Sequence, residues 1–301
     1  MNAFVTVNEN WRMAFLVNDQ NILERLKNTN NLFMKKYNLI VVTIISTLAL
    51  SACSYGEGEY GVFLSYDGDL EDLSDYKTVV IDAQYFDKED IEDFKEQGHE
   101  VYSYINVGSI ESFRDYYDEY EDLTLDVYEH WEEEKWVDVS SDRWQEFILD
   151  TLAPSLLDKG IDGFFVDNCD VYYQYTDEEI FEGLTVIMKG LIATGAEVVV
   201  NGGDAFVTAY TDGGGEAHDI ITGINQESVL TRIDWDEEEF HAAEADDEEY
   251  FKDYIETYAD EGIDIYLLEY TDDPLLSMKI RRYCKAHGFK YYISDSLELD
   301  Y

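Results

Sequence analysis

Basic residues are scarce in this chain of 301 residues. It holds 20 Lys and Arg against 68 Asp and Glu, which gives a formal net charge of −48 at pH 7. The negative electrostatic field of such a chain repels nucleic acid and anionic lipid and attracts cations, including cationic polymers. We therefore expect no nucleic-acid partner. Many of the acids fall in runs of helical spacing, such as residues 235–249, so a solvated surface that keeps the protein soluble also explains the bulk charge.

Cysteine and histidine are also few. The three cysteines, Cys53, Cys169 and Cys284, form no C-x-x-C pair and have no histidine at a spacing that would bind zinc. We expect Cys169 and Cys284 to be two buried thiols. A disulfide between them is the alternative, and their separation in the fold decides it.

Several catalytic motifs are missing. No Gly-rich phosphate loop lies at a strand-to-helix turn, no G-x-S-x-G elbow is present, and no His and Asp residues cluster at metal-ligand spacing. These absences argue against nucleotide-dependent enzymes, serine hydrolases and metalloenzymes. We expect neither a metal nor an organic cofactor.

One apolar run stands near the start, at residues 39–50. The basic pair Lys35 and Lys36 precedes it and Leu50-Ser-Ala-Cys53 ends it, which is typical of a secretory signal peptide too short to span a membrane comfortably. The ending resembles the bacterial lipobox, which implies cleavage before Cys53 and lipid attachment to its thiol. We expect an exported bacterial lipoprotein, anchored to the membrane at the cell surface, outside the cytoplasm. An uncleaved N-terminal anchor is the alternative.

These features divide the chain into four segments. Residues 1–33 form a polar segment that we interpret as disordered upstream sequence read through before an initiator at Met34, and residues 34–53 form the signal peptide. Residues 54–59 are a short linker, and residues 60–301 form one domain. The roughly 248 residues after Cys53 suit one large α/β domain.

Short β-branched or aromatic runs alternate with longer segments of helical spacing from residue 60 onward. This pattern predicts strands at 60–66, 78–83, 101–106, 161–167, 197–201, 219–225, 263–269 and 290–294, and helices at 88–97, 142–159, 177–195, 247–261 and 274–287. Eight alternating units in about 240 residues indicate an α/β fold, a single-domain (β/α)8 TIM barrel with a parallel sheet. The first crossover is too short for a full helix, so one unit is degenerate. The long connection after the third strand, residues 108–141, is expected to add a strand or an ordered loop over the barrel mouth.

Polar residues follow the predicted strands. In a TIM barrel the C-terminal ends of the strands meet on one face, so residues remote in sequence converge there. We predict a mouth lined by carboxylates, amides and tyrosines that bind substrate: Asp67, Asp82, Gln84, Tyr104, Asn106, Asn168, Asp170, Asn201, Glu269 and Tyr270.

The apolar run 160–167 ends at Asp167. Asp167 either begins the chemistry or caps the following helix, as Asp often does after a strand. Two carboxylates across a cleft are what glycosidic bond cleavage requires, one to protonate the leaving oxygen and one to attack or to activate water. Asp167 and Glu227 form the best catalytic pair, because the fourth and sixth strands are near each other around a barrel. Other acids at the mouth compete on spacing alone.

The motifs resemble those of glycoside hydrolase family 114. The resemblance lies in residues 60–67, 80–86, 98–111, 136–140, 160–168 and 223–228, in order along nearly all of residues 60–296. It implies a TIM-barrel endo-α-1,4-polygalactosaminidase that hydrolyses largely deacetylated galactosamine polymers of biofilm exopolysaccharide. By motif match, it implies that Asp167 and Glu227 are the catalytic pair. We assign Asp167 as the nucleophile and Glu227 as the acid/base, in retaining chemistry. A cationic amino-sugar polymer also suits an acidic cleft.

Two alternatives remain open at the level of sequence. One is a surface lipoprotein that binds polysaccharide without cutting it, and the other is a glycosidase of the same fold that acts on a different α-linked glycan. We expect a monomer in either case.

Overall fold

The computed structural model describes residues 58–301, apart from residues 129, 130, 132, 236 and 238. The predicted upstream segment, the signal peptide with its lipidated Cys53, and most of the linker lie outside the described residues, so these remain predictions. Among the helices that are described, none is long and apolar enough to cross a membrane.

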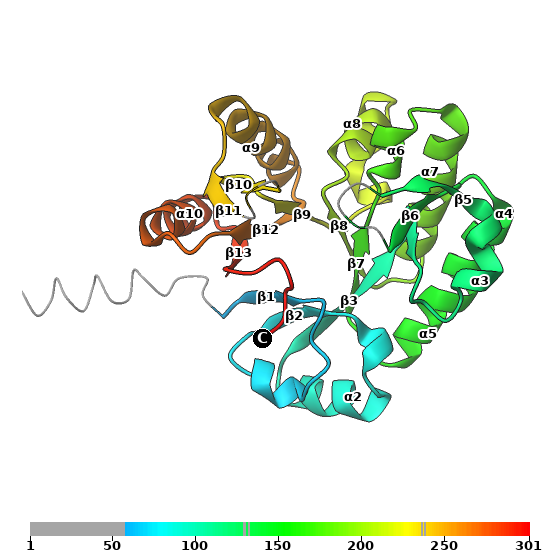
Figure 1. Cartoon of the computed structure of the whole chain (residues 1–301), viewed down its shortest axis with the longest axis horizontal. Helices are drawn as coiled ribbons and strands as arrows, with labels where there is room; N and C mark the ends of the chain where they lie inside the picture. The colour runs from blue at the N-terminus through cyan, green and yellow to red at the C-terminus, as the bar shows by residue number, and fades with distance from the viewer. Residues whose placement is uncertain (1–57, 129–130, 132, 236, 238) are drawn as a thin grey trace, which may run out of the picture. The chain divides into compact units, whose positions relative to one another are not determined.

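Eight parallel strands form the centre of the molecule and close almost completely into a barrel (Figure 1). Neighbouring strands are hydrogen-bonded in the order β1-β2-β3-β7-β8-β9-β12-β13. The first and last strands meet through packing, with the rings of Phe63 and Tyr292 5.2 Å apart. The strands are β1 (Tyr60–Phe63), β2 (Thr78–Ile81), β3 (Glu100–Asn106), β7 (Gly163–Asp167), β8 (Glu197–Asn201), β9 (Gly223–Glu227), β12 (Asp264–Tyr270) and β13 (Lys290–Ser294). The predicted TIM barrel is thereby confirmed.

Helices connect these strands and cover the outside of the barrel, as Figure 1 shows. They are α2 (Lys88–Glu96), α4 (Asp142–Phe147), α5 (Ala153–Asp158), α6 (Val171–Gln174), α7 (Glu178–Ile192), α8 (Asp204–Asp212), α9 (Ala245–Asp260) and α10 (Pro274–His287), with 3-10 turns η1 (Leu70–Leu73), η2 (Ala83–Tyr85) and η5 (Ala217–Asp219). The turn η1 replaces a helix between β1 and β2, so the first unit is degenerate as expected.

Three details differ from the sequence-based prediction. The helix predicted at 142–159 contains a π-helical turn, η4 (Ile148–Leu152), before Pro154, whose missing N–H cannot continue the hydrogen-bond ladder. Helix α8 was not predicted. The acidic run 235–249 is not one helix: it holds the second strand of the hairpin β10 (Thr231–Asp234) and β11 (Glu239–Ala242), and α9 begins only at Ala245.

The insertion after β3 builds a small antiparallel sheet. Its strands are β4 (Ser109–Glu111), β5 (Thr124–Val127) and β6 (Glu134–Val137), in the order β4-β6-β5, with α3 (Tyr117–Tyr120) and η3 (Glu121–Leu123) between them. This confirms the ordered element predicted within residues 108–141.

Strand alternation sorts the core into two layers. Along β12, Tyr266, Leu268 and Tyr270 belong to the cluster inside the barrel, whereas Ile265 and Leu267 belong to the layer between barrel and helices. The period of two along a strand produces this division, and it decides which side chains at each strand end can enter the barrel mouth.

The two described cysteines, Cys169 and Cys284, are both buried and free, so the disulfide alternative is excluded.

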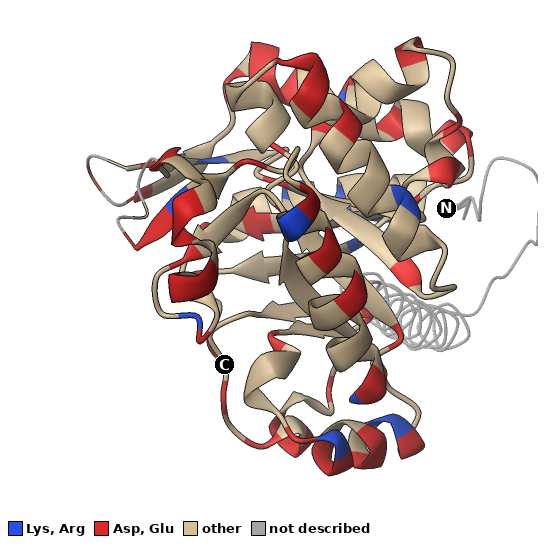
Figure 2. Cartoon of the chain, turned by 90° about the vertical axis from the view of Figure 1, so that its right-hand side faces the viewer, with Lys and Arg blue, Asp and Glu red and all other residues tan. Residues whose placement is uncertain are grey.

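The acidic residues lie largely on the outside of the barrel. Figure 2 shows Asp and Glu spread over the outer helices, with few Lys and Arg among them. The bulk charge therefore coats the solvated surface.

Candidate active site

A cavity of about 910 Å³ opens at the C-terminal ends of the barrel strands. Asp167 enters it from β7 and Glu227 from β9, each as the last residue of its strand. Asn201, the last residue of β8, lies between them in the strand order. The parallel register brings these three strand ends together although they are 60 residues apart in sequence.

One amide group joins the two carboxylates. Asn201 Nδ2 donates to Asp167 Oδ1 at 3.0 Å and to Glu227 Oε1 at 2.7 Å. Two oxygens bonded to one nitrogen at these distances can be separated by no more than about 5.7 Å. The second oxygen of Glu227 accepts a hydrogen bond from Tyr270 Oη at 2.9 Å.

A relay inside the barrel orients the Asn201 amide. Tyr60 Oη donates to Asn225 Oδ1 at 3.1 Å, and Asn225 Nδ2 donates to Asn201 Oδ1 at 2.7 Å. Because Asn201 accepts through its oxygen, its nitrogen must face the carboxylates. The relay thus turns both N–H groups toward Asp167 and Glu227.

The residue after each of these carboxylates has an unusual backbone. Asn168 has a φ of 64° and Ser228 a φ of 55°, in the left-handed region that residues other than glycine rarely adopt. Such conformations cost free energy and persist where the surrounding structure enforces them, often at functional sites. Because these conformations directly follow Asp167 and Glu227, they indicate that the ends of β7 and β9 belong to a functional site.

The cavity raises the pKa of its acids. Burial raises the pKa of Asp167 to about 8, and the negative charge of Glu134 adds to the rise, while the hydrogen bond from Asn201 opposes it. Burial also raises the pKa of Glu227, against hydrogen bonds from Asn201 and Tyr270. Burial and the charge of Asp204 raise the pKa of Asp170 to about 7. Burial in this cavity therefore favours the protonated form of all three carboxyl groups.

A buried ion-pair cluster supports one wall. Arg114 Nη1 lies 2.5 Å from Asp82 Oδ2, and Arg114 Nη2 lies 2.8 Å from Glu111 Oε1. All three side chains are almost fully buried, and the guanidinium is paired on two sides. The cluster fixes the start of the inserted sheet against η2.

The structure brings most of the predicted contact residues together. Those that line the cavity are Asp67, Asp82, Tyr104, Asn168, Asp170, Asn201 and Tyr270. Asp82 is occupied by Arg114 and by the backbone N–H of Gln84, so its role is structural. Asp67 is exposed.

Three predicted contact residues do not line the cavity. Glu269 is fully buried on the outer side of β12, because it alternates with Leu268 and Tyr270, which face the barrel interior. Asn106 is buried and bonds to Ser109 and Glu134. Gln84 lies in η2, beside the mouth. These three residues therefore lie outside the cavity lining, whereas the other seven predicted contact residues belong to it.

Sequence reasoning missed Glu134, which lines the cavity from β6. Its Oε1 accepts hydrogen bonds from Asn106 Nδ2 at 3.0 Å, from Asn168 Nδ2 at 2.8 Å and from Ser109 Oγ. Glu134 comes from the inserted sheet, so a search restricted to barrel-strand ends could not find it. A Glu beside alternating apolar residues in the segment 134–139 was the only local signal.

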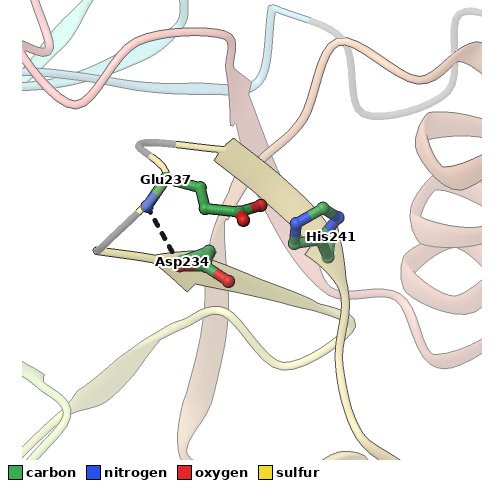
Figure 3. Close-up of side chains that lie close together, drawn as sticks. All are labelled: Asp234, Glu237 and His241. Atoms are coloured by element: carbon green, nitrogen blue, oxygen red, sulfur yellow. Dashed lines mark hydrogen bonds between the residues drawn. The ribbon is translucent and has the colours of Figure 1, made fainter.

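One side-chain cluster has the spacing of a cation site. The ligand atoms of Asp234, Glu237 and His241 lie within 4.8 Å of one another at the β10–β11 hairpin (Figure 3). All three side chains are at least partly exposed, and Arg232 Nη1 lies 3.6 Å from Asp234 Oδ2, where its charge opposes a cation. The cluster alone does not establish a metal site.

Comparisons with known proteins agree with this architecture. The glycoside hydrolase domain of PelA from Pseudomonas aeruginosa is 18% identical with a TM-score of 0.67, over 82% of this chain and 97% of that one. The crystal structure of Aspergillus fumigatus Ega3 in complex with galactosamine is 17% identical with a TM-score of 0.63, over 81% and 93%. An α-galactosidase from Thermus thermophilus is 10% identical with a TM-score of 0.52, over 81% and 59%. These likenesses show a shared fold.

Sequence comparison is more specific. No curated protein sequence matches this chain. The model of glycoside-hydrolase family GH114, however, matches residues 57–301, which is the whole barrel. The chain therefore belongs to glycoside hydrolase family 114 and is a glycosidase.

Proposed function

We propose that this glycosidase cleaves α-1,4-linked, galactosamine-rich polysaccharide internally, by a retaining mechanism that uses Asp167 and Glu227. The observation that carries the proposal is the Asn201 amide, which holds the two carboxylates no more than about 5.7 Å apart, nearest oxygen to nearest oxygen. Retaining enzymes place their carboxyl groups about 5–5.5 Å apart, whereas inverting enzymes need about 6.5–9.5 Å to admit a water.

In the first step, Asp167 attacks the anomeric carbon while Glu227 donates its proton to the leaving glycosidic oxygen. Asp167 Oδ2 is suited to the attack, because it has no hydrogen-bond partner among the described residues. In the second step, Glu227 takes a proton from water, the water attacks the same carbon, and the ester to Asp167 breaks. The product keeps its configuration, and both carboxyl groups return to their initial states.

Exposed aromatic side chains on the cavity rim support internal cleavage. Those that line the cavity and are largely exposed are Tyr85, Phe113, Trp131, Tyr173 and Trp235. Aromatic rings can pack on the faces of sugars, and such a rim suits a chain longer than one residue. The rings of Trp131 and Trp235 lie 6.4 Å apart, edge to face, although they come from two different insertions.

The acidity of the cavity supports an amino-sugar substrate. Arg114 is the only Lys or Arg among the described residues that line it, and that guanidinium is already paired. A cavity dominated by carboxylates favours a cationic ligand. The Ega3 structure with galactosamine provides a related precedent for that sugar.

The test incubates the full chain with partially deacetylated α-1,4-galactosamine polymer and follows the oligosaccharides released. We expect release of internal fragments with the α configuration at the new reducing ends. The Glu227→Gln variant should lose about 10³-fold or more in kcat. No release by the wild type, or release only from a different α-linked glycan, would refute the substrate. Full activity of Glu227→Gln would refute the catalytic pair.

We also propose that the enzyme is held at the outer face of a bacterial membrane by lipid on Cys53. The support is the basic pair, the apolar run and the small residues before Cys53 in the sequence. Expression in a bacterium should place the wild type in the membrane fraction and Cys53→Ser in the soluble exported fraction. Equal partitioning of the two proteins would contradict lipidation.

A further inference from the structure

Glu134 is a further carboxylate in the cavity, and the two-carboxylate mechanism does not use it. It lies on β6, paired in register with Glu111 of β4. Its Oε1 accepts three hydrogen bonds, from Asn106, Ser109 and Asn168. The group is thus held firmly at one oxygen, by residues that flank Asp167: Asn168 follows Asp167, and Asn106 is its register partner on β3.

The other oxygen of Glu134, Oε2, has no hydrogen-bond partner among the described residues. The side chain of Glu134 lines the cavity. A carboxylate with one oxygen anchored and one oxygen free is arranged to accept a donor from a ligand.

Among the described residues, no cation forms an ion pair with Glu134. Arg114 is paired with Asp82 and Glu111, and Lys135, the next residue on β6, binds Tyr117 Oη at 2.5 Å and lies 3.5 Å from Glu121. A buried carboxylate without a counter-charge is costly, and a ligand that brings a positive charge removes that cost.

Glu134 also acts on Asp167. In the part of the chain that the structure describes, the titratable groups that face Asp167 are all acids, namely Tyr104, Tyr128, Glu134, Asp170, Glu227 and Tyr270. Among the charged ones, Glu134 has the largest effect and raises the pKa of Asp167. The field of Glu134 therefore favours the protonated form of Asp167, although a nucleophile must be ionised.

We propose that Glu134 binds the ammonium group of the amino sugar in the cavity. The bound ammonium cancels the negative field of Glu134, and Asp167 then releases its proton to solvent and becomes the nucleophile. A neutral N-acetylated sugar brings no charge and leaves Asp167 protonated. Glu134 would thus be a specificity residue that selects amine over acetamide in both binding and catalysis. This inference rests on the proposed function, because it concerns the same substrate.

The test compares Glu134→Gln with the wild type, both as full chains, on α-1,4-galactosamine oligosaccharides and on the same oligosaccharides after N-acetylation. Gln keeps the size of the side chain and an oxygen that can accept the three hydrogen bonds, but removes the charge. We expect kcat/KM on the amine substrate to fall about tenfold or more, the effect of losing one charged contact. The Ki of the acetylated oligosaccharide as an inhibitor should not change, and its kcat/KM should not fall, because Asp167 ionises more readily once the Glu134 charge is removed. Glu133→Gln, an exposed neighbour that changes the net charge equally, is the matched control.

The pH dependence separates this role from a structural one. Loss of the Glu134 charge lowers the pKa of Asp167, so the acid limb of kcat/KM should move to lower pH in Glu134→Gln. In the wild type, the acid limb of kcat on the amine substrate should lie at lower pH than that of kcat/KM. This second measurement needs no variant, so it holds even if Glu134→Gln does not fold.

The outcomes are distinguishable. If the wild type cleaves neither oligosaccharide, the proposed function fails. If the wild type cleaves the amine substrate but Glu134→Gln lowers kcat/KM equally on both substrates, the inference on Glu134 fails and the proposed function stands. The same holds if the acid limbs of kcat and kcat/KM coincide in the wild type.

Discussion

The Asn201 amide donates a hydrogen bond to each of two carboxylates. Its own orientation depends on hydrogen bonds from Asn225 and, through it, from Tyr60. The side chain carries no charge and cannot take part in the chemistry as an acid or base. Its contribution is to set the separation of Asp167 and Glu227 and to stabilise their ionised forms. It is therefore a positioning residue, and its removal should act on kcat more than on KM.

We expect Asn201→Ala to lower kcat by about 10²-fold, the usual result of a misplacement on the order of 1 Å. The hydrogen bonds from Asn201 lower the pKa of both carboxyl groups, so their loss raises both pKa values. The acid limb of kcat/KM, which follows ionisation of Asp167, should then move to higher pH. Pre-steady-state and pH-rate measurements test both effects.

Gln84→Ala is the matched control, because this amide lies beside the mouth but does not line the cavity. Activity of Gln84→Ala should stay near that of the wild type. If kcat fell equally in both variants, any change near the cavity would lower the activity, and the proposed positioning role of Asn201 would be refuted.

At the scale of elements, the β10–β11 hairpin depends on Glu269. Glu269 accepts hydrogen bonds from the backbone N–H of Leu230, at 3.0 Å to Oε1, and from Thr231 Oγ1, at 2.6 Å to Oε2. These contacts tie the segment before β10 to the outer face of β12. The hairpin in turn carries Trp235 to the cavity rim.

Stability should depend on pH through this anchor. Burial raises the pKa of Glu269 to about 7, against about 4.3 in an unfolded chain. The folded state then holds a proton that the unfolded state releases, so stability is lost as pH rises from about 4.3 through 7. Between pH 5 and pH 8, the free energy of unfolding of Glu269→Gln should improve relative to the wild type by about 3 kcal/mol.

Denaturant unfolding of both proteins at several pH values measures this difference. Glu261→Gln, at an exposed helix end, is the control, and its difference from the wild type should not change with pH. A difference for Glu269→Gln that is the same at pH 5 and pH 8 would show that Glu269 stays ionised in the folded protein.

At the scale of the whole molecule, charge has two separate consequences. The acids on the outer helices form a solvated coat (Figure 2), and together with the cavity acids they give the chain a net charge of −48. The coat is independent of the chemistry, but its field extends into solution and draws cations toward the barrel mouth.

The rate of capture should therefore depend on salt. Between low salt and about 0.5 M NaCl, kcat/KM on the deacetylated polymer should fall by about tenfold or more, because screening shortens the range of the field. The N-acetylated polymer should show little change. A loss of equal size on both polymers would indicate an effect of salt on the enzyme itself rather than on steering.

Alternation of short apolar runs with helical segments was enough to predict eight strands, a TIM barrel and a degenerate first unit. All three features depend on local patterns, since the periods of strands and helices are set by consecutive residues. The same period of two excludes Glu269 from the mouth, because Glu269 alternates with Tyr270, which faces inward. The local pattern did not predict the β10–β11 hairpin. Its acidic residues have the spacing of a helix, but they lie in a strand pair. This pair is held by buried Glu269 of β12, which accepts a hydrogen bond from Thr231.

The order of residues along the chain was enough to predict the barrel, to exclude the common nucleotide, serine and zinc motifs, and to bring two carboxylates to the ends of β7 and β9. Only the folded structure showed that one amide joins Asp167 to Glu227, that Cys169 and Cys284 are unpaired, and that Glu134 enters the cavity from an inserted sheet. The physical reason is that strand and helix patterns are local along the chain. Distances between side chains, burial and the resulting pKa shifts depend on residues brought together from remote positions only when the barrel closes.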